Sequence, residues 1–219
     1  MIYTVEWCEM EREQRKLTAS EQKRKLQFDK LSARLVADGY KRYDLTVDIV
    51  KVSFIALAVM LPFVGVAVAL YFAVNGAQGL NGSFKELLLF VAVTVACVFV
   101  HEGIHGLVWA ICCRSFKAIS FGITVRTLTP YCTCARPLKK WQYIAGAAMP
   151  TLLLGVGLTA LAVITSRLWL LITAVTLILG GGGDFYVVFR LFAFKSKKKT
   201  LYCDHPYECG TVVFEEIGK

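Results

Sequence analysis

The chain has 219 residues, of which 56% are hydrophobic, and a formal net charge of +9. Its mean hydropathy of +0.55 excludes an ordinary soluble domain. Four apolar segments exceed the ~18 residues that indicate a membrane span: Val52–Val74, Leu87–Ile111, Trp141–Ser166 and Leu168–Phe189. We therefore expect an all-α integral membrane protein with four transmembrane helices.

The positive charge is distributed unevenly between the segments that flank these spans. Of 25 Lys and Arg residues, 11 precede the first span, one lies in the first loop, six in the middle loop, one between the last two spans and six after the last. This alternation follows the positive-inside rule and predicts cytoplasmic termini in a multi-pass protein of the cytoplasmic membrane. It explains the basic charge without nucleic acid, because no basic–aromatic binding module is visible.

We divide the chain into a charged N-terminal extension (1–48), a four-span membrane domain (49–194) and a basic cytoplasmic tail (195–219). In the extension, Thr18 and Glu21 form a capping box that predicts the start of a helix, and Asp38-Gly39 predicts its end. This helix is expected to be solvated at the anionic inner face of the bilayer. The lysine-rich start of the tail suits the same anionic headgroups.

The second span carries the motif His101-Glu102-Gly103-Ile104-His105. On a helix, two histidines four residues apart lie on one face, so both imidazoles can bind one Zn²⁺. Glu102 is then placed to act as the general base for a zinc-activated water. Ionisable side chains at bilayer depth are costly and indicate a functional site.

The middle loop predicts a small cytoplasmic β-hairpin. Residues 119–125 alternate between apolar and polar side chains, residues 127–130 resemble a turn, and residues 131–135 are expected to form the returning strand. Two interpretations remain open for this hairpin. It either holds an extended substrate segment as an additional strand or plugs the space between helices.

The fourth span contains one charged residue, Asp184, directly after four glycines. Asp184 follows Arg167 by 17 residues, or ~26 Å of helix, and His101 follows Lys85 by 16 residues, or ~24 Å. Both helices run in the same direction, so the carboxylate and the motif are expected at one level. We predict that the glycines let the backbone unwind and that Asp184 is the third metal ligand. His205 in the tail is the weaker candidate for that role.

Six of the eight cysteines lie at the cytoplasmic end of the second span, in the middle loop or in the tail. In the reducing cytoplasm, disulfides are rare. The Cys132-x-Cys134 and Cys112-Cys113 pairs lack the spacing of a zinc knuckle, so unpaired thiols are favoured over a second metal site.

The chain resembles a bacterial family of integral-membrane zincin peptidases of unknown function and, more distantly, the site-2 protease class. The resemblance covers roughly residues 45–215, and the matching pieces are H-E-G-I-H (101–105), F-G-I (121–123), Y-C-T-C-A-R-P-L (131–138), A-G-A-A-M-P (145–150), G-G-G-D (181–184) and D-H-P (204–206). The resemblance implies zinc ligation by His101, His105 and Asp184, with Glu102 catalytic. Site-2 proteases carry an Asn where Ala147 stands and a Gly after the Asp, where this chain has Phe185. The substrate-handling role of that Asn therefore does not transfer.

The sequence thus predicts a zinc metalloendopeptidase that cleaves a membrane protein or peptide in or beside the lipid bilayer. Two alternatives stay open: a non-catalytic membrane protein with a structural or sensing zinc site, and a metal transporter. The sequence names neither the substrate nor the oligomeric state.

Overall fold

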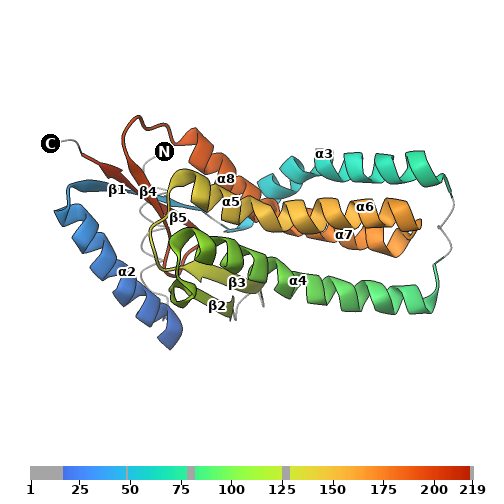
Figure 1. Ribbon diagram of the computed structural model, residues 1–219, viewed down its shortest axis with the longest axis horizontal. Helices are drawn as coiled ribbons and strands as arrows, with labels where there is room; N and C mark the ends of the chain where they lie inside the picture. The colour runs from blue at the N-terminus through green and yellow to red at the C-terminus, as the bar shows by residue number, and fades with distance from the viewer. Residues whose placement is uncertain (1–16, 48, 78–81, 125–128, 218–219) are drawn as a thin grey trace.

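The computed structural model describes residues 17–47, 49–77, 82–124 and 129–217. Long helices extend toward one end of the molecule, and short strands with one further helix gather at the other end (Figure 1). The helices that are long and apolar enough to cross a membrane are Val52–Asn75, Phe84–Cys113, Lys140–Thr165 and Leu168–Ala193. The prediction of four such helices is confirmed.

The first two spans are single helices, α3 (Ile49–Asn75) and α4 (Phe84–Cys113). The third span consists of α5 (Lys140–Pro150), a π-helical turn η2 (Thr151–Val156) and α6 (Gly157–Thr165). The fourth span consists of α7 (Leu168–Gly180) and α8 (Gly182–Ala193). Both α3 and α4 pack against α7, and they lie on opposite sides of the α6–α7 pair (Figure 1).

The predicted hairpin is present between the second and third spans. After a short 3₁₀ turn, η1 (Phe116–Ala118), strand β2 (Ile119–Thr124) pairs antiparallel with β3 (Thr129–Cys134). The predicted turn at 127–130 lies partly outside the described residues. The hairpin runs beside the C-terminal half of α4, because Phe121 packs where a side chain at Gly106 would otherwise lie.

A second, unpredicted sheet joins a strand of the N-terminal extension to two strands of the tail. Strand β1 (Tyr40–Thr46) comes from the N-terminal extension, whereas β4 (Thr200–Asp204) and β5 (Gly210–Glu216) come from the tail. The strand order is β1-β5-β4, and both pairs are antiparallel. The expectation of an all-α protein with one hairpin is therefore incomplete: the protein is mainly helical, with two small sheets.

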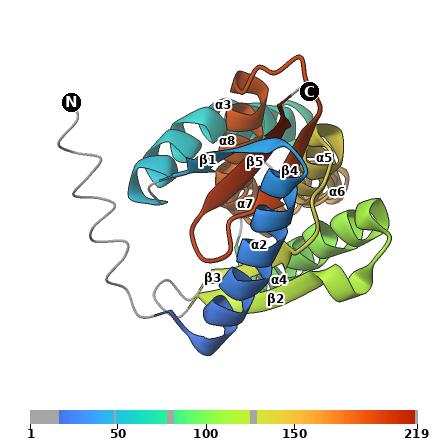
Figure 2. The same ribbon diagram turned by 90° about the vertical axis from the view of Figure 1, so that its left-hand side faces the viewer.

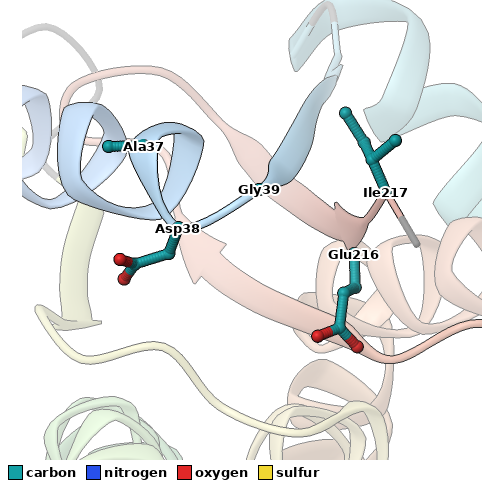
Figure 3. A pocket seen from close by; sticks show the side chains of 5 residues that line it. All are labelled: Ala37, Asp38, Gly39, Glu216 and Ile217. Atoms are coloured by element: carbon teal, nitrogen blue, oxygen red, sulfur yellow. The ribbon is translucent and has the colours of Figure 1, made fainter. Parts of the chain in front are cut away.

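Helix α2 (Ala19–Ala37) confirms the predicted N-terminal helix. Thr18 caps it, the reciprocal bonds with Glu21 are present, and the helix ends at Asp38. Figure 2 shows α2 lying across both small sheets. A shallow recess at its C-terminal end is lined by residues 37–39 and 216–217 and contains none of the predicted site residues (Figure 3).

The three-stranded sheet is covered on both faces. Val212 and Phe214 of β5 pack with Phe28 of α2 on one face. Val213 of β5 and Tyr202 of β4 pack on the other face against α4, α5 and α8. Because side chains alternate along a strand, this sheet connects α2 to the helices that carry the predicted site.

Candidate metal centre

Helix α4 brings the histidines of the motif together as predicted. His101 and His105 lie one turn apart with ring centroids 4.9 Å apart, and both side chains are buried. The possible ligand atoms of His101, Glu102 and His105 all lie within 4.8 Å of one another. Among the described residues, this is the single group of three or more His, Cys, Asp or Glu with that spacing.

The fourth span breaks within its glycine run, as the sequence predicts. Helix α7 ends at Gly180 and α8 begins at Gly182, with Gly181 between them. A Cβ atom on Gly181 would lie 1.9 Å from the Thr151 hydroxyl oxygen, and one on Gly182 would lie 2.9 Å from the Cβ of Ala56. Glycine is needed at both positions because the first and third spans approach this break closely.

The break places Asp184 against both histidines. Its Oδ2 atom lies 3.1 Å from Nε2 of His101 and 3.3 Å from Nε2 of His105. Tetrahedral zinc with bonds of about 2.0–2.1 Å holds its ligand atoms about 3.3 Å apart. The observed separations therefore fit a two-histidine, one-carboxylate zinc site, and the donor types are those that zinc prefers.

A backbone carbonyl of the third span orients His105. Nδ1 of His105 lies 2.8 Å from the carbonyl oxygen of Gly146. A carbonyl only accepts hydrogen bonds, so Nδ1 carries the proton and the lone pair of Nε2 faces Asp184. The His105 ring also stacks on Trp109, with centroids 5.2 Å apart. Such partners fix the tautomer and ring orientation of a metal-binding histidine.

The hairpin approaches the predicted general base. The carboxylate of Glu102 lies beside the backbone of Cys132 in β3, and β3 packs along α4. Glu102 is partly buried, whereas both histidines are buried. The site therefore lies between α4 and the edge of β3.

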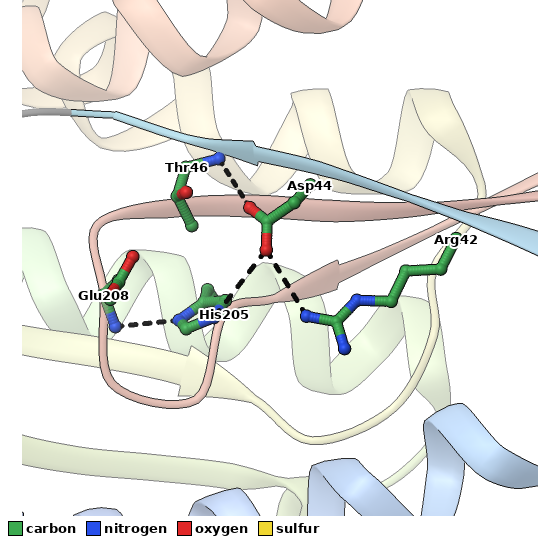
Figure 4. Close-up of polar contacts among 5 residues, drawn as sticks. All are labelled: Arg42, Asp44, Thr46, His205 and Glu208. Atoms are coloured by element: carbon green, nitrogen blue, oxygen red, sulfur yellow. Dashed lines mark hydrogen bonds and ion pairs between the residues drawn. The ribbon is translucent and has the colours of Figure 1, made fainter. Parts of the chain in front are cut away.

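His205, the weaker candidate for the third ligand, lies elsewhere. Its Nδ1 accepts a hydrogen bond from the Glu208 backbone N–H, and its Nε2 lies 4.0 Å from Asp44 of β1 (Figure 4). The ring also faces Phe28 of α2. His205 thus occupies the sheet face that α2 covers, whereas the preceding residue, Asp204, bonds to Tyr143 of α5 on the opposite face.

The thiols match the prediction of unpaired cysteines. All seven cysteines in the described ranges are free. Burial raises the pKa of Cys134 to about 12 and also raises the pKa of Cys132. Both thiols are therefore protonated at neutral pH.

The geometry of two histidines and a carboxylate, with a glutamate next to the first histidine, is that of a zincin-type site. Residues 94–199 match the model of a family described as "putative zincin peptidase". The family resemblance seen in the sequence is confirmed over these residues. The zincin segment begins within α4 before the motif and ends at Lys199, so it includes His101, Glu102, His105 and Asp184. No curated protein and no solved structure matches the chain.

Sequence reasoning missed several residues that surround this zincin site. Trp109 follows His105 by four residues, and that spacing on one helix face is a signal that was available. The Gly146 carbonyl and the Cys132 backbone give no such signal, because almost every residue type carries the same backbone groups. Asp204 belongs to the D-H-P piece of the resemblance, but the sequence predicts a possible role for His205 alone in that piece.

Proposed function

We propose that this protein is a zinc-dependent endopeptidase that hydrolyses peptide bonds in or beside the cytoplasmic membrane. The observation that carries the proposal is the convergence of His101, His105 and Asp184 from two membrane-length helices, with Glu102 next to the first histidine. Charged groups at this depth are costly and are retained for a function. The zincin family match supports the same class of reaction.

Zinc bound by two neutral imidazoles and one carboxylate keeps a coordination position open and, as a Lewis acid, lowers the pKa of water toward 7. His101, His105 and Asp184 would hold the ion, and the Gly146 carbonyl keeps His105 in the tautomer that binding requires. Glu102 accepts a proton from the attacking water and passes it to the leaving amine nitrogen. A structural or sensing zinc site would give Glu102 no role, and for this reason we favour hydrolysis.

The outer edge of β3 supports a substrate-binding role for the hairpin. The backbone N–H of Ala135 bonds to Ala118 in the hairpin ladder. Because bonded positions alternate in an antiparallel pair, the backbone groups of Cys132 and Cys134 point away from β2. The backbone N–H of Cys134 donates a hydrogen bond to Asp204, and the backbone of Cys132 faces Glu102. We propose that an extended segment of a membrane protein or peptide pairs with this edge and is cleaved beside Glu102.

We further propose that the hairpin, the three-stranded sheet and α2 lie in the cytoplasm. These elements gather at one end of the helical bundle (Figure 1). The alternation of Lys and Arg along the chain assigns that end to the cytoplasmic side. Substrates would then reach the site from the inner half of the bilayer or from its cytoplasmic surface.

The proposal is tested by comparing membrane proteins in cells that produce the wild type, Glu102→Gln or no protein. Mass spectrometry of new N-termini identifies cleaved proteins. We expect cleavage products with the wild type alone, while purified Glu102→Gln retains zinc because Glu102 is not a ligand. The same products in Glu102→Gln cells would contradict hydrolysis by this site. A phenotype rescued equally by Glu102→Gln would favour a structural or sensing role.

A further inference from the structure

The Asp204 carboxylate lies at the end of β4, on the sheet face that packs against the membrane helices. Its Oδ1 accepts a hydrogen bond of 2.5 Å from the Tyr143 hydroxyl, and its Oδ2 accepts one of 2.7 Å from the backbone N–H of Cys134. Burial raises the pKa of this carboxyl, while both hydrogen bonds act in the opposite direction. Partial burial of a carboxylate is costly, and the two oxygens of Asp204 bond to two different elements, α5 and β3.

One set of contacts leads from Asp204 to the histidine ligand. Tyr143 lies near the start of α5, and its backbone carbonyl accepts a hydrogen bond of 3.3 Å from the Trp109 indole. Trp109 stacks on His105 with an angle of 20° between the rings. The carbonyl of Gly146, one turn after Tyr143, accepts a hydrogen bond from His105. The Tyr143 hydroxyl therefore fixes the helix turn that orients the His105 ring.

A second set of contacts leads from Asp204 to the general base. The backbone N–H of Cys134 is held by Oδ2 of Asp204, and Cys132, two residues earlier on the same edge of β3, faces Glu102. In a strand, residues two apart project their backbone groups to the same edge. A shift of Cys134 would therefore move the β3 edge relative to Glu102.

We propose that Asp204 is a positioning residue that sets the geometry of the metal centre from the cytoplasmic sheet. Through Tyr143 it holds His105, and through Cys134 it holds the strand edge beside Glu102. This inference rests on the proposed zinc peptidase function. It assigns a role to the three-stranded sheet, which would otherwise be only a cover for the helix ends.

The test uses metal binding by the purified full-length protein in detergent. Tyr143→Phe removes one hydroxyl from the contacts that lead to His105. Tyr202→Phe is the matched control, because Tyr202 is equally buried in the same core cluster and its hydroxyl pairs with Thr200. Asp204→Ala removes both hydrogen bonds. Zinc affinity is measured by competition with a chelator, and the visible spectrum of the Co²⁺-substituted protein reports the ligand geometry.

We expect zinc affinity to fall about tenfold in Tyr143→Phe, the lower end of the range for groups that orient metal ligands, and further in Asp204→Ala. The Co²⁺ spectrum should change in both variants, and Tyr202→Phe should match the wild type. A merely structural role would lower thermal stability alike in Tyr143→Phe and Tyr202→Phe without changing the Co²⁺ spectrum, and that result would overturn the proposal. Should Asp204→Ala fail to fold, the two tyrosine variants decide the question.

The outcomes also separate this inference from the peptidase proposal. If Tyr143→Phe binds metal as the wild type does while Glu102→Gln still abolishes cleavage, the positioning of His105 by Asp204 through Tyr143 is refuted and the peptidase stands. If Tyr143→Phe weakens zinc binding while the wild type and Glu102→Gln yield the same cleavage products, the positioning role stands and peptide hydrolysis at this site is refuted.

Discussion

Adding one methyl group at Gly146 tests how tightly the third span holds the metal centre. A Cβ atom at this position would lie 1.9 Å from Nε1 and 2.2 Å from Cδ1 of Trp109. Trp109 is 5% exposed and lies between His105 and Tyr143, so its rigid ring has no free space to enter. Gly146→Ala must therefore displace α5 or the indole, and both contact His105.

Overpacking of this kind costs about 1–3 kcal/mol, and we expect the upper half of that range because the clash involves a ring. Gly157→Ala is the matched control: Gly157 starts α6 in the same span, and a Cβ there would meet no atom within 4 Å. Alanine loses less conformational entropy than glycine when a helix forms, so Gly157→Ala should be stabilised by about 0.5–1 kcal/mol. The two variants should therefore differ by about 3 kcal/mol, or roughly 6–12 °C in thermal midpoint for a chain of this size.

The assay is thermal unfolding in detergent, with zinc content measured on the same preparations. We expect Gly146→Ala to melt below the wild type and to lose zinc, and Gly157→Ala to melt at or above the wild type with its zinc retained. A Gly146→Ala variant as stable as Gly157→Ala, with full zinc, would refute the packing of Trp109 between α5 and His105.

Three further predictions concern α2, the small sheets and the orientation of the chain. Arg24→Ala removes the hydrogen bond to the Tyr131 hydroxyl that ties α2 to the hairpin, so limited proteolysis should release α2 faster than in the wild type. Partial burial raises the pKa of Asp44, but hydrogen bonds from Thr46 and the nearby positive charges of His205 and Arg42 outweigh this effect. The pKa of Asp44 therefore lies below its ordinary value of 3.8. Asp44 therefore stabilises the fold above that pH, and the thermal midpoints of wild type and Asp44→Asn should converge as pH falls below 3.8. A topology reporter inserted after Gly76 should report the outside, and one fused to the C-terminus should report the cytoplasm; the reverse pattern would contradict our orientation.

The long apolar helices are predictable because their physical constraints are strong. Apolar length alone locates the four helices. An ionisable group in a long apolar helix is costly and needs a partner, and for this reason Asp184 can be expected to meet His101. The glycine run before Asp184 marks the place where the helix breaks. The capping box at Thr18 is equally local, and it is present in the structure.

The three-stranded sheet is not predictable in the same way. Strand β1 pairs with β5 across more than 160 residues of sequence, and Tyr43 opposite Val213 leaves no local signal of that pairing. Its strands are short and flanked by charged residues, so their composition resembles that of solvated segments. The contacts of Asp204 depend on this sheet, and for this reason the sequence shows a D-H-P piece without showing what its carboxylate binds.

The most direct test of the central claim is the zinc content of the purified wild type beside His105→Ala, Asp184→Ala and Glu102→Gln. We expect about one zinc per chain in the wild type and in Glu102→Gln, and a large loss in the two ligand variants. That pattern would establish that the second and fourth spans meet at one metal ion. Full zinc in Asp184→Ala, or none in the wild type, would contradict the account.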